Sequence, residues 1–312
     1  MEMPNTRGQS TALSQGLSQV LRRHPLLFYF LITFSFTWIC EVLAYGILHL
    51  PDFSIGRVFI VGPTVAAYIM TSVTEGRAGV FRLLRRYVLW RVSIPWYLFI
   101  LLGIPALVLL GCFVLPGAVA ALRAPTPSFA LSYVELFVIV FFGVALFEEP
   151  GWRGFALPRF QQRPGPLVGT LVLGLLWALW HLPLFLFDPE YGGAGNGFAG
   201  IMVPYTTFII GTLALTVIFT WVFNNARGSL LLVMVLHASY DTAYTTVLMR
   251  LFPSLSTAPL FNVLGNLNIA LIVVAVLIIV VTRGRLSYEI YQHEMALLTP
   301  ATNREQEKDE AL

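Results

Sequence analysis

Two adjacent glutamates and an arginine stand at the end of one of the most apolar stretches of the chain. Residues 147–158 read FEEPGWRGFALP, in which Glu148 and Glu149 precede Pro-Gly and Arg153. Arg153 follows Glu149 by four residues, so the two side chains can form an ion pair on one helix face. The other carboxyl would remain partly desolvated and could exchange protons near neutral pH. The stretch therefore predicts acid–base chemistry.

Two further motifs place imidazoles in apolar surroundings. WALWH puts Trp177 one turn before His181, where the indole can pack beside the ring. HASYD puts His237 and Asp241 four residues apart on one helix face. Glu41, in FTWICEVLAYG, is expected either to hydrogen-bond between helices or to support an arginine.

The elements that position these groups are membrane helices. Of the 312 residues, 57% are hydrophobic and 11% charged, whereas a soluble domain has about 25% charged residues. The chain contains repeated apolar runs of roughly 18 residues or more. In lipid, runs of this length satisfy the hydrogen bonds of their backbone only as α-helices, so we expect an all-α, polytopic helical bundle. The predicted spans, about eight in number, are 26–50, 57–74, 96–120, 131–158, 166–187, 200–223, 229–250 and 260–282.

Basic residues predict the orientation of this bundle. With a cytoplasmic N-terminus and eight spans, 16 of the 19 Lys and Arg residues fall on the cytoplasmic side, as the positive-inside rule requires. Both termini are then cytoplasmic. We divide the chain into a cytoplasmic segment 1–25, a membrane protease domain 26–282, and a cytoplasmic tail 283–312 that we expect to be disordered at its end.

The predicted depths of the polar motifs agree. Counted from the loop near 160–165, the paired glutamates lie roughly 17 Å along their helix and His181 roughly 22 Å along the next. Counted from Ser229, Asp241 and His237 lie roughly 18 and 12 Å along span seven. Three helices can therefore direct acids and imidazoles into one layer. Ionisable groups at membrane depth are costly and are usually functional.

These motifs resemble a known family. EEPGWR resembles the EExxxR signature of the CAAX-protease and bacteriocin-processing (CPBP) intramembrane proteases, WALWH resembles their second motif, and HASYD resembles their late HxxxN/D motif. The three occur in the family's order, and the resemblance covers about residues 130–245. It departs from the family at Trp177, where Phe is frequent, and at Asp241, where some members have Asn.

The resemblance implies hydrolysis of a peptide bond in a membrane-associated or lipidated peptide, as in CAAX processing. Glu148 would activate a water as general base, and Glu149 would pair with Arg153. His181 would help to hold the water or the oxyanion. The histidine and aspartate of HASYD would complete the water and substrate site.

The sequence leaves the metal question open. Glu148, His181 and His237 could form a two-histidine, one-carboxylate zinc site, as in a metalloprotease. The same residues could instead act without a metal, through a glutamate-activated water.

Two other classes of function remain. Buried Glu, His and Asp also build proton relays, but a proton-coupled transporter predicts internal repeats with broken helices, and we find no convincing repeat. A non-catalytic immunity or scaffold protein is the other alternative. The expected partners are membrane lipid and a membrane-associated peptide or lipidated protein, with no nucleic acid. Arginine-rich loops fit a bacterial inner-membrane protein.

Overall fold

Helices make up the regular structure throughout the residues that the computed structural model describes, which are 16, 18–50, 59–187, 197–256 and 268–298. The predicted all-α class is therefore confirmed. The end of the tail, predicted to be disordered, lies outside the described residues. The first half of the chain contains α2 (Pro25–Glu41), η1 (Val42–Ile47), α3 (Gly62–Arg85), η3 (Arg86–Val88), α4 (Ile94–Leu98), η4 (Phe99–Gly103), α5 (Ile104–Cys112), α6 (Ala118–Ala121), α7 (Phe129–Val140), η5 (Phe141–Ala145), α8 (Leu146–Glu149), η6 (Pro150–Ala156) and α9 (Leu157–Gln162).

The second half continues with helices of the same kind. They are α10 (Pro166–Trp180), α11 (Leu182–Phe187), α12 (Gly197–Asn225), α13 (Leu230–Thr246), η8 (Val247–Leu251), α14 (Pro253–Ser256), α16 (Ile269–Val281) and α17 (Tyr288–Leu298).

Five helical stretches are long and apolar enough to cross a membrane. They are Pro25–Ile47, Ile94–Cys112, Phe129–Gln162, Pro166–Phe187 and Gly197–Asn225. Each coincides with one of the predicted spans to within a few residues, apart from the second, which ends at Cys112 and not at residue 120 as predicted. Large apolar side chains such as Leu131, Phe142 and Val281 are exposed on the outside of the bundle, as expected of surfaces in contact with lipid.

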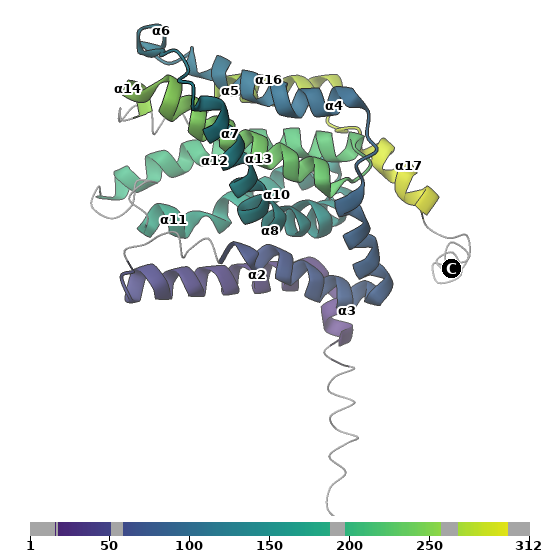
Figure 1. Ribbon diagram of the computed structural model, residues 1–312. Helices are drawn as coiled ribbons and strands as arrows, with labels where there is room; N and C mark the ends of the chain where they lie inside the picture. Colours follow the sequence, from purple (N-terminus) through teal and green to yellow (C-terminus); the bar gives the residue numbers. More distant parts are fainter. Residues whose placement is uncertain (1–15, 17, 51–58, 188–196, 257–267, 299–312) are drawn as a thin grey trace, which may run out of the picture.

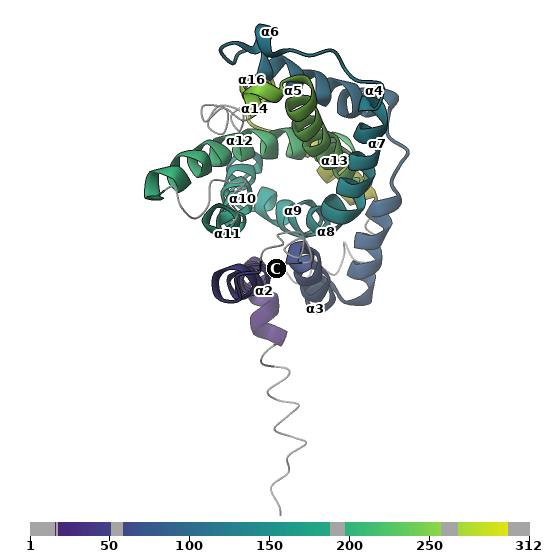
Figure 2. The ribbon, with the colours of Figure 1, turned by 60° about the vertical axis from the view of Figure 1, so that its left-hand side comes forward.

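The bundle surrounds the motif helix. Figure 2 shows α8 and α9 between α10 and α13, with α2 and α3 on one side and α5 and α16 on the other. α3 packs along α8 and η6, α10 packs on α9 and α12, and α13 packs on α7 and α5. In Figure 1 the C-terminal end of α3 and helix α17 lie together at the right-hand end of the bundle. These contacts place α8 and η6 in the interior, where α3, α10 and α13 meet.

Candidate active site

The helix that carries EEPGWR changes its winding at the motif. The regular turn that holds Glu148 and Glu149 ends at Pro150, and residues Pro150–Ala156 form a π-helix. Pro150 has no N–H to give to the carbonyl of Leu146, so the ordinary hydrogen-bond ladder cannot continue there. The sequence predicts a weak point at Pro150 and Gly151, and the structure has a wider turn at this place. π-helical turns occur frequently at functional sites.

One oxygen of Glu149 binds two cationic or potentially cationic groups. Arg153 Nη1 lies 2.8 Å from Oε1, and His237 Nδ1 lies 2.7 Å from the same atom. The carboxylate can only accept, so Nδ1 of His237 donates. All three side chains are buried. The predicted ion pair between Glu149 and Arg153 is therefore confirmed, and the contact joins span four to α13.

The guanidinium of Arg153 lies between two aromatic rings. Its centre is 4.3 Å from the ring of Trp177 and 4.3 Å from that of Phe219. Arg153 is one of the 16 basic residues that the predicted orientation assigns to the cytoplasmic side, but the structure buries it fully in η6. A buried guanidinium is tolerated because the carboxylate and the π faces replace water. Phe219, on α12, belongs to no sequence motif and was not predicted.

Glu148 is held differently. Its Oε2 accepts hydrogen bonds from the indole nitrogens of Trp152, at 3.1 Å, and Trp177, at 2.8 Å. Among the described residues, no side chain donates to the other oxygen, Oε1. Trp152 was not predicted as a site residue, although its position four residues after Glu148 places the two side chains on one helix face. Two neutral donors therefore fix one oxygen and leave the other available.

His181 ends α10 beside this carboxylate. Its Nδ1 lies 2.8 Å from the carbonyl oxygen of Trp177, which can only accept, so Nδ1 carries the proton and Nε2 has the lone pair in the neutral ring. The ring packs on the edges of Trp177 and Trp180, with centroids 5.9 and 4.8 Å away. The predicted packing of Trp177 beside the imidazole is confirmed.

The late motif, HASYD, forms the exposed side of the cluster. Nε2 of His237 lies 3.4 Å from Oδ2 of Asp241, and the Asp241 side chain is 35% exposed. An imidazolium donates from both nitrogens, so a protonated His237 matches the two carboxylates that face it. The shared helix face of His237 and Asp241 is as predicted. The cluster is accessible near Asp241 and closed near Glu149.

Glu41 lies apart from this cluster. It is buried in α2, and its Oε2 has no hydrogen-bond partner among the described residues. The expected arginine partner is therefore not found in the part of the chain that the structure describes. Within the described residues, no hydrogen bond or ion pair joins Glu41 to the motif residues.

The donor atoms do not fit a zinc site as they lie. Within the described residues, no group of three or more His, Cys, Asp and Glu side chains could hold a metal ion. Both nitrogens of His237 face carboxylates, Nδ1 of His181 faces a carbonyl, and one oxygen of Glu148 is occupied by two indoles. A zinc ion at Glu148, His181 and His237 would require these partners to be displaced.

Comparison with known proteins agrees with the motifs. A sequence model of the type II CAAX prenyl endopeptidase Rce1-like family matches residues 130–243. CAAX prenyl protease 2 of Methanococcus maripaludis is 29% identical over 110 residues, which are 35% of this chain and 40% of that protein. The match thus spans about 40% of the length of this relative. The segment 130–243 that the family model matches carries all three motifs, so this part of the chain is similar to the type II CAAX prenyl endopeptidases.

Proposed function

We propose that this protein is an intramembrane endopeptidase that hydrolyses a peptide bond of a membrane-associated or lipidated peptide. The name of the matching relative, a CAAX prenyl protease, supports a prenylated peptide as one substrate class. Because only part of that relative is matched, its substrate is a hypothesis for this chain.

The observation that carries this proposal is that the two adjacent glutamates have different hydrogen-bond and ion-pair partners. Glu149 is committed to Arg153 and His237 and has a structural role. Glu148 has only neutral donors, on one oxygen, and its other oxygen can accept a proton. A carboxylate oxygen that no donor or cation occupies can take a proton from a water molecule, as a general base does.

We propose that a water molecule lies between Glu148 and His181. Oε1 of Glu148 and the lone pair of His181 Nε2 are both acceptors, and a water can donate one hydrogen to each. Such a water has its own lone pair free for attack on a carbonyl carbon. His181 thus orients the nucleophile, and Glu148 removes its proton.

The reaction then proceeds without other reactants. The water oxygen bonds to the substrate carbonyl carbon as its proton passes to Glu148, and the carbonyl oxygen becomes an oxyanion. A donor on the open side, where Nε2 of His237 faces Asp241, would stabilise that charge. Glu148 then gives its proton to the amide nitrogen, the C–N bond breaks, and a carboxylic acid and an amine result.

We also propose eight membrane crossings with both termini in the cytoplasm of a bacterial cell. Three helices beyond the five apolar stretches are candidates: the apolar part of α3 up to residue 74, α13 continued by η8, and α16 with 13 residues. The C-terminal end of α3, whose last turn carries Arg82 and Arg85, and the helix α17 lie at one end of the bundle (Figure 1). This grouping supports that end as the cytoplasmic one. The protease domain would then span 26–282, between the cytoplasmic segments 1–25 and 283–312.

Direct cleavage assays test the function. Purified wild type and Glu148→Gln, in liposomes, would be given three peptides: a farnesylated CAAX peptide, the same peptide without lipid, and a transmembrane peptide. We expect mass spectrometry to find cleavage by wild type of at least the first, and none by Glu148→Gln. Equal behaviour of the two proteins on all three would overturn the proposal. In that case, a proton flux that is lost in Glu148→Gln would indicate a transporter. A cellular phenotype that is unaffected by Glu148→Gln would indicate a scaffold.

A further inference from the structure

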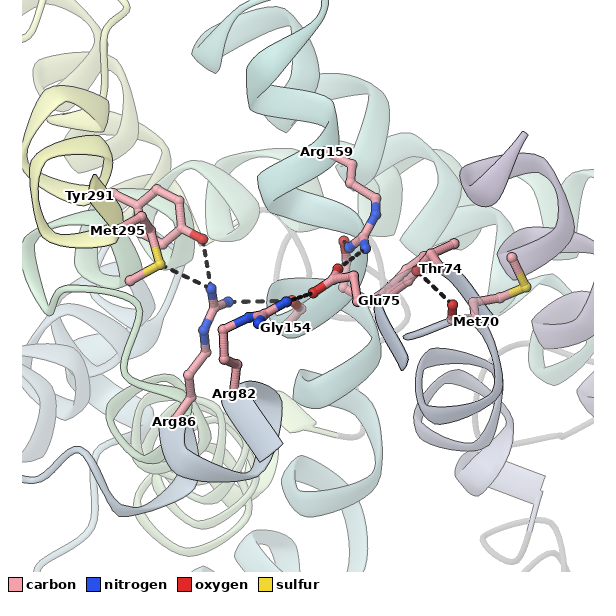
Figure 3. Close-up of polar contacts among 10 residues, drawn as sticks. Met70, Thr74, Glu75, Arg82, Arg86, Gly154, Arg159, Tyr291 and Met295 are labelled. Atoms are coloured by element: carbon pink, nitrogen blue, oxygen red, sulfur yellow. Dashed lines mark hydrogen bonds and ion pairs between the residues drawn. The ribbon is translucent and has the colours of Figure 1, made fainter. Parts of the chain in front are cut away.

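The π-helix of the active site receives a hydrogen bond from outside the family-matched segment. Pro158 lies four residues after Gly154 and has no N–H, so it cannot supply the usual helical bond to the Gly154 carbonyl. Nη1 of Arg86, in η3 at the end of α3, lies 3.4 Å from that carbonyl oxygen (Figure 3). Gly154 directly follows Arg153, which pairs with Glu149.

The C-terminal helix α17 holds Arg86 from the other side. Nη2 of Arg86 donates to the hydroxyl of Tyr291, at 2.9 Å, and contacts the sulfur of Met295, at 3.2 Å (Figure 3). The guanidinium also lies 5.7 Å from the centroid of the Tyr291 ring. Tyr291 and Met295 are four residues apart and face the same way. The guanidinium of Arg86 therefore joins α3, η6 and α17.

α17 is itself fixed to the bundle. The ring of Tyr291 is buried and packs on that of Phe223 in α12, with centroids 5.3 Å apart. Just before α17, the carbonyl of Leu286 accepts a hydrogen bond from Asn224 at 2.8 Å. A side chain anchored by α17 is thus anchored to the membrane helices.

α3 holds the motif at its other end as well. The hydroxyl of Thr64 donates to the carbonyl of Phe147 at 2.6 Å, one residue before Glu148. Two side chains of α3 and η3 therefore bind backbone oxygens on either side of the segment that carries Glu148, Glu149 and Arg153. A proline in the motif helix removes a backbone donor near each of these places.

We propose that Arg86 is a positioning residue for the proposed protease site, and that α17 serves as its anchor. Arg86 fixes the register of η6, and through it the pairing of Arg153 with Glu149 and the direction of Glu148. A displacement of about 1 Å in such a group can reduce a rate about 100-fold. This inference rests on the proposed function for its kinetic consequences, but not for its structural ones.

Kinetics of four variants test the role of Arg86. Arg86→Ala should lower kcat about tenfold with KM changed less than about twofold, because the substrate does not touch this residue. Arg86→Lys keeps one donor and should restore most of kcat. Tyr291→Phe removes only the hydroxyl and should have an intermediate effect. Arg85→Ala, an exposed neighbour, is the matched control and should equal wild type.

A spectroscopic measurement tests the same contact without any cleavage. In protein labelled with 5-fluorotryptophan, the ¹⁹F resonances of Trp152 and Trp177 report their hydrogen bonds to Glu148. We expect Arg86→Ala and Tyr291→Phe to shift at least one of these two resonances and to leave that of Trp96 unchanged. Trp96 packs on Trp221 and Phe99 and contacts neither glutamate.

The two readouts separate the possible failures. If the wild type cleaves no peptide, the proposed function fails, while the resonances still decide whether Arg86 positions the site. If both resonances and kcat are unchanged in Arg86→Ala, the positioning role is wrong. Should Arg86→Ala not fold, Arg86→Lys and Tyr291→Phe carry the same test, and wild-type resonances in both would overturn it.

Discussion

The indole nitrogen of Trp177 lies 2.8 Å from Oε2 of Glu148 and joins the second motif to the first. The indole of Trp152 binds the same oxygen from within the motif helix, at 3.1 Å. The direction of this carboxylate is thus set by two rigid donors from two helices. The ring of Trp177 also covers the guanidinium of Arg153, so one side chain supports both adjacent glutamates.

Trp177→Phe separates these two roles, because it keeps a ring over Arg153 and removes the N–H. We expect kcat to fall about 10- to 100-fold, since a hydrogen bond to a charged group contributes about 1.5–3 kcal/mol. Steady-state cleavage of the best peptide measures this. Trp96→Phe, which removes an indole away from the glutamates, is the control. A wild-type kcat in Trp177→Phe would show that this hydrogen bond does not matter for the reaction.

Neighbouring glutamates should respond differently to the same isosteric change. Glu149→Gln leaves the buried guanidinium of Arg153 without its anion and should destabilise the protein by about 3–5 kcal/mol. Glu148→Gln keeps an oxygen that can accept from both indoles, so it should cost no more than about 1 kcal/mol while abolishing cleavage. Unfolding by titration with SDS in mixed micelles measures both. Equal losses of stability would contradict the division of roles between these residues.

The arrangement of donors also predicts how the activity responds to chelators. Since Glu148, His181 and His237 are engaged by other partners, we expect wild type prepared with a chelator to keep its kcat, and added zinc to give no increase. Metal content measured on the same sample is the control. Loss of activity on chelation with full recovery on adding zinc would show that the site rearranges around a metal.

Much of the fold could be predicted because lipid imposes strong constraints on sequence. Span five was predicted at 166–187, and the helix is found at Pro166–Phe187, where an apolar run lies between a proline and the acidic sequence DPE. The end of the helix Gly62–Arg85 was harder to predict, because the helix continues beyond its apolar part into a segment rich in arginine. Charge marks where the lipid ends, but a helix can continue through that boundary.

Of the candidate site, pairs within one helix were predictable and contacts between helices were not. The spacing of four residues gave the pairs Glu149–Arg153 and His237–Asp241. It could not show that His237 binds Glu149 across two helices, because this depends on how each helix is rotated. The aromatic ring of Phe219 and the donors on α3 were missed for the same reason. Their residue types are ordinary, and only packing brings them to the motif.

The close approach of α3 to the motif helix depends on Gly151. A Cβ added there would lie 2.6 Å from the carbonyl oxygen of Pro63 and 2.6 Å from the hydroxyl of Tyr29. We expect Gly151→Ala to lower stability by about 1–3 kcal/mol, since the backbone of α3 must move. Gly143, eight residues earlier in the same long helix, has open space around its Cα, and Gly143→Ala should be neutral or slightly stabilising. SDS titration compares the two, and equal stability of both variants would contradict a tight contact between α3 and η6.

The ion-pair group at the end of the motif helix should make stability depend on pH. Glu75 binds Arg159 of α9, at 2.5 Å, and Arg82, at 2.8 Å, beside the contacts of Arg86 (Figure 3). Partial burial alone would raise the pKa of Glu75, but the two arginines outweigh it, and the pKa lies below its ordinary value of 4.5. A lowered pKa means that the stabilisation is present above about pH 4.5 and is lost as the pH falls through the pKa of the folded state.

Glu75→Gln should therefore lower the Tm by about 1–3 °C at about pH 7, a small effect because the pair is partly exposed. At about pH 3 the difference from wild type should shrink, since the wild-type carboxyl is then increasingly protonated. Glu135→Gln, which neutralises an exposed carboxylate that has no ion pair among the described residues, should match wild type at both pH values. Thermal melts in detergent at the two pH values provide the comparison. A difference that is equal at both, or larger in acid, would show that Glu75 contributes through its shape or packing and that its charge does not hold α9 to α3.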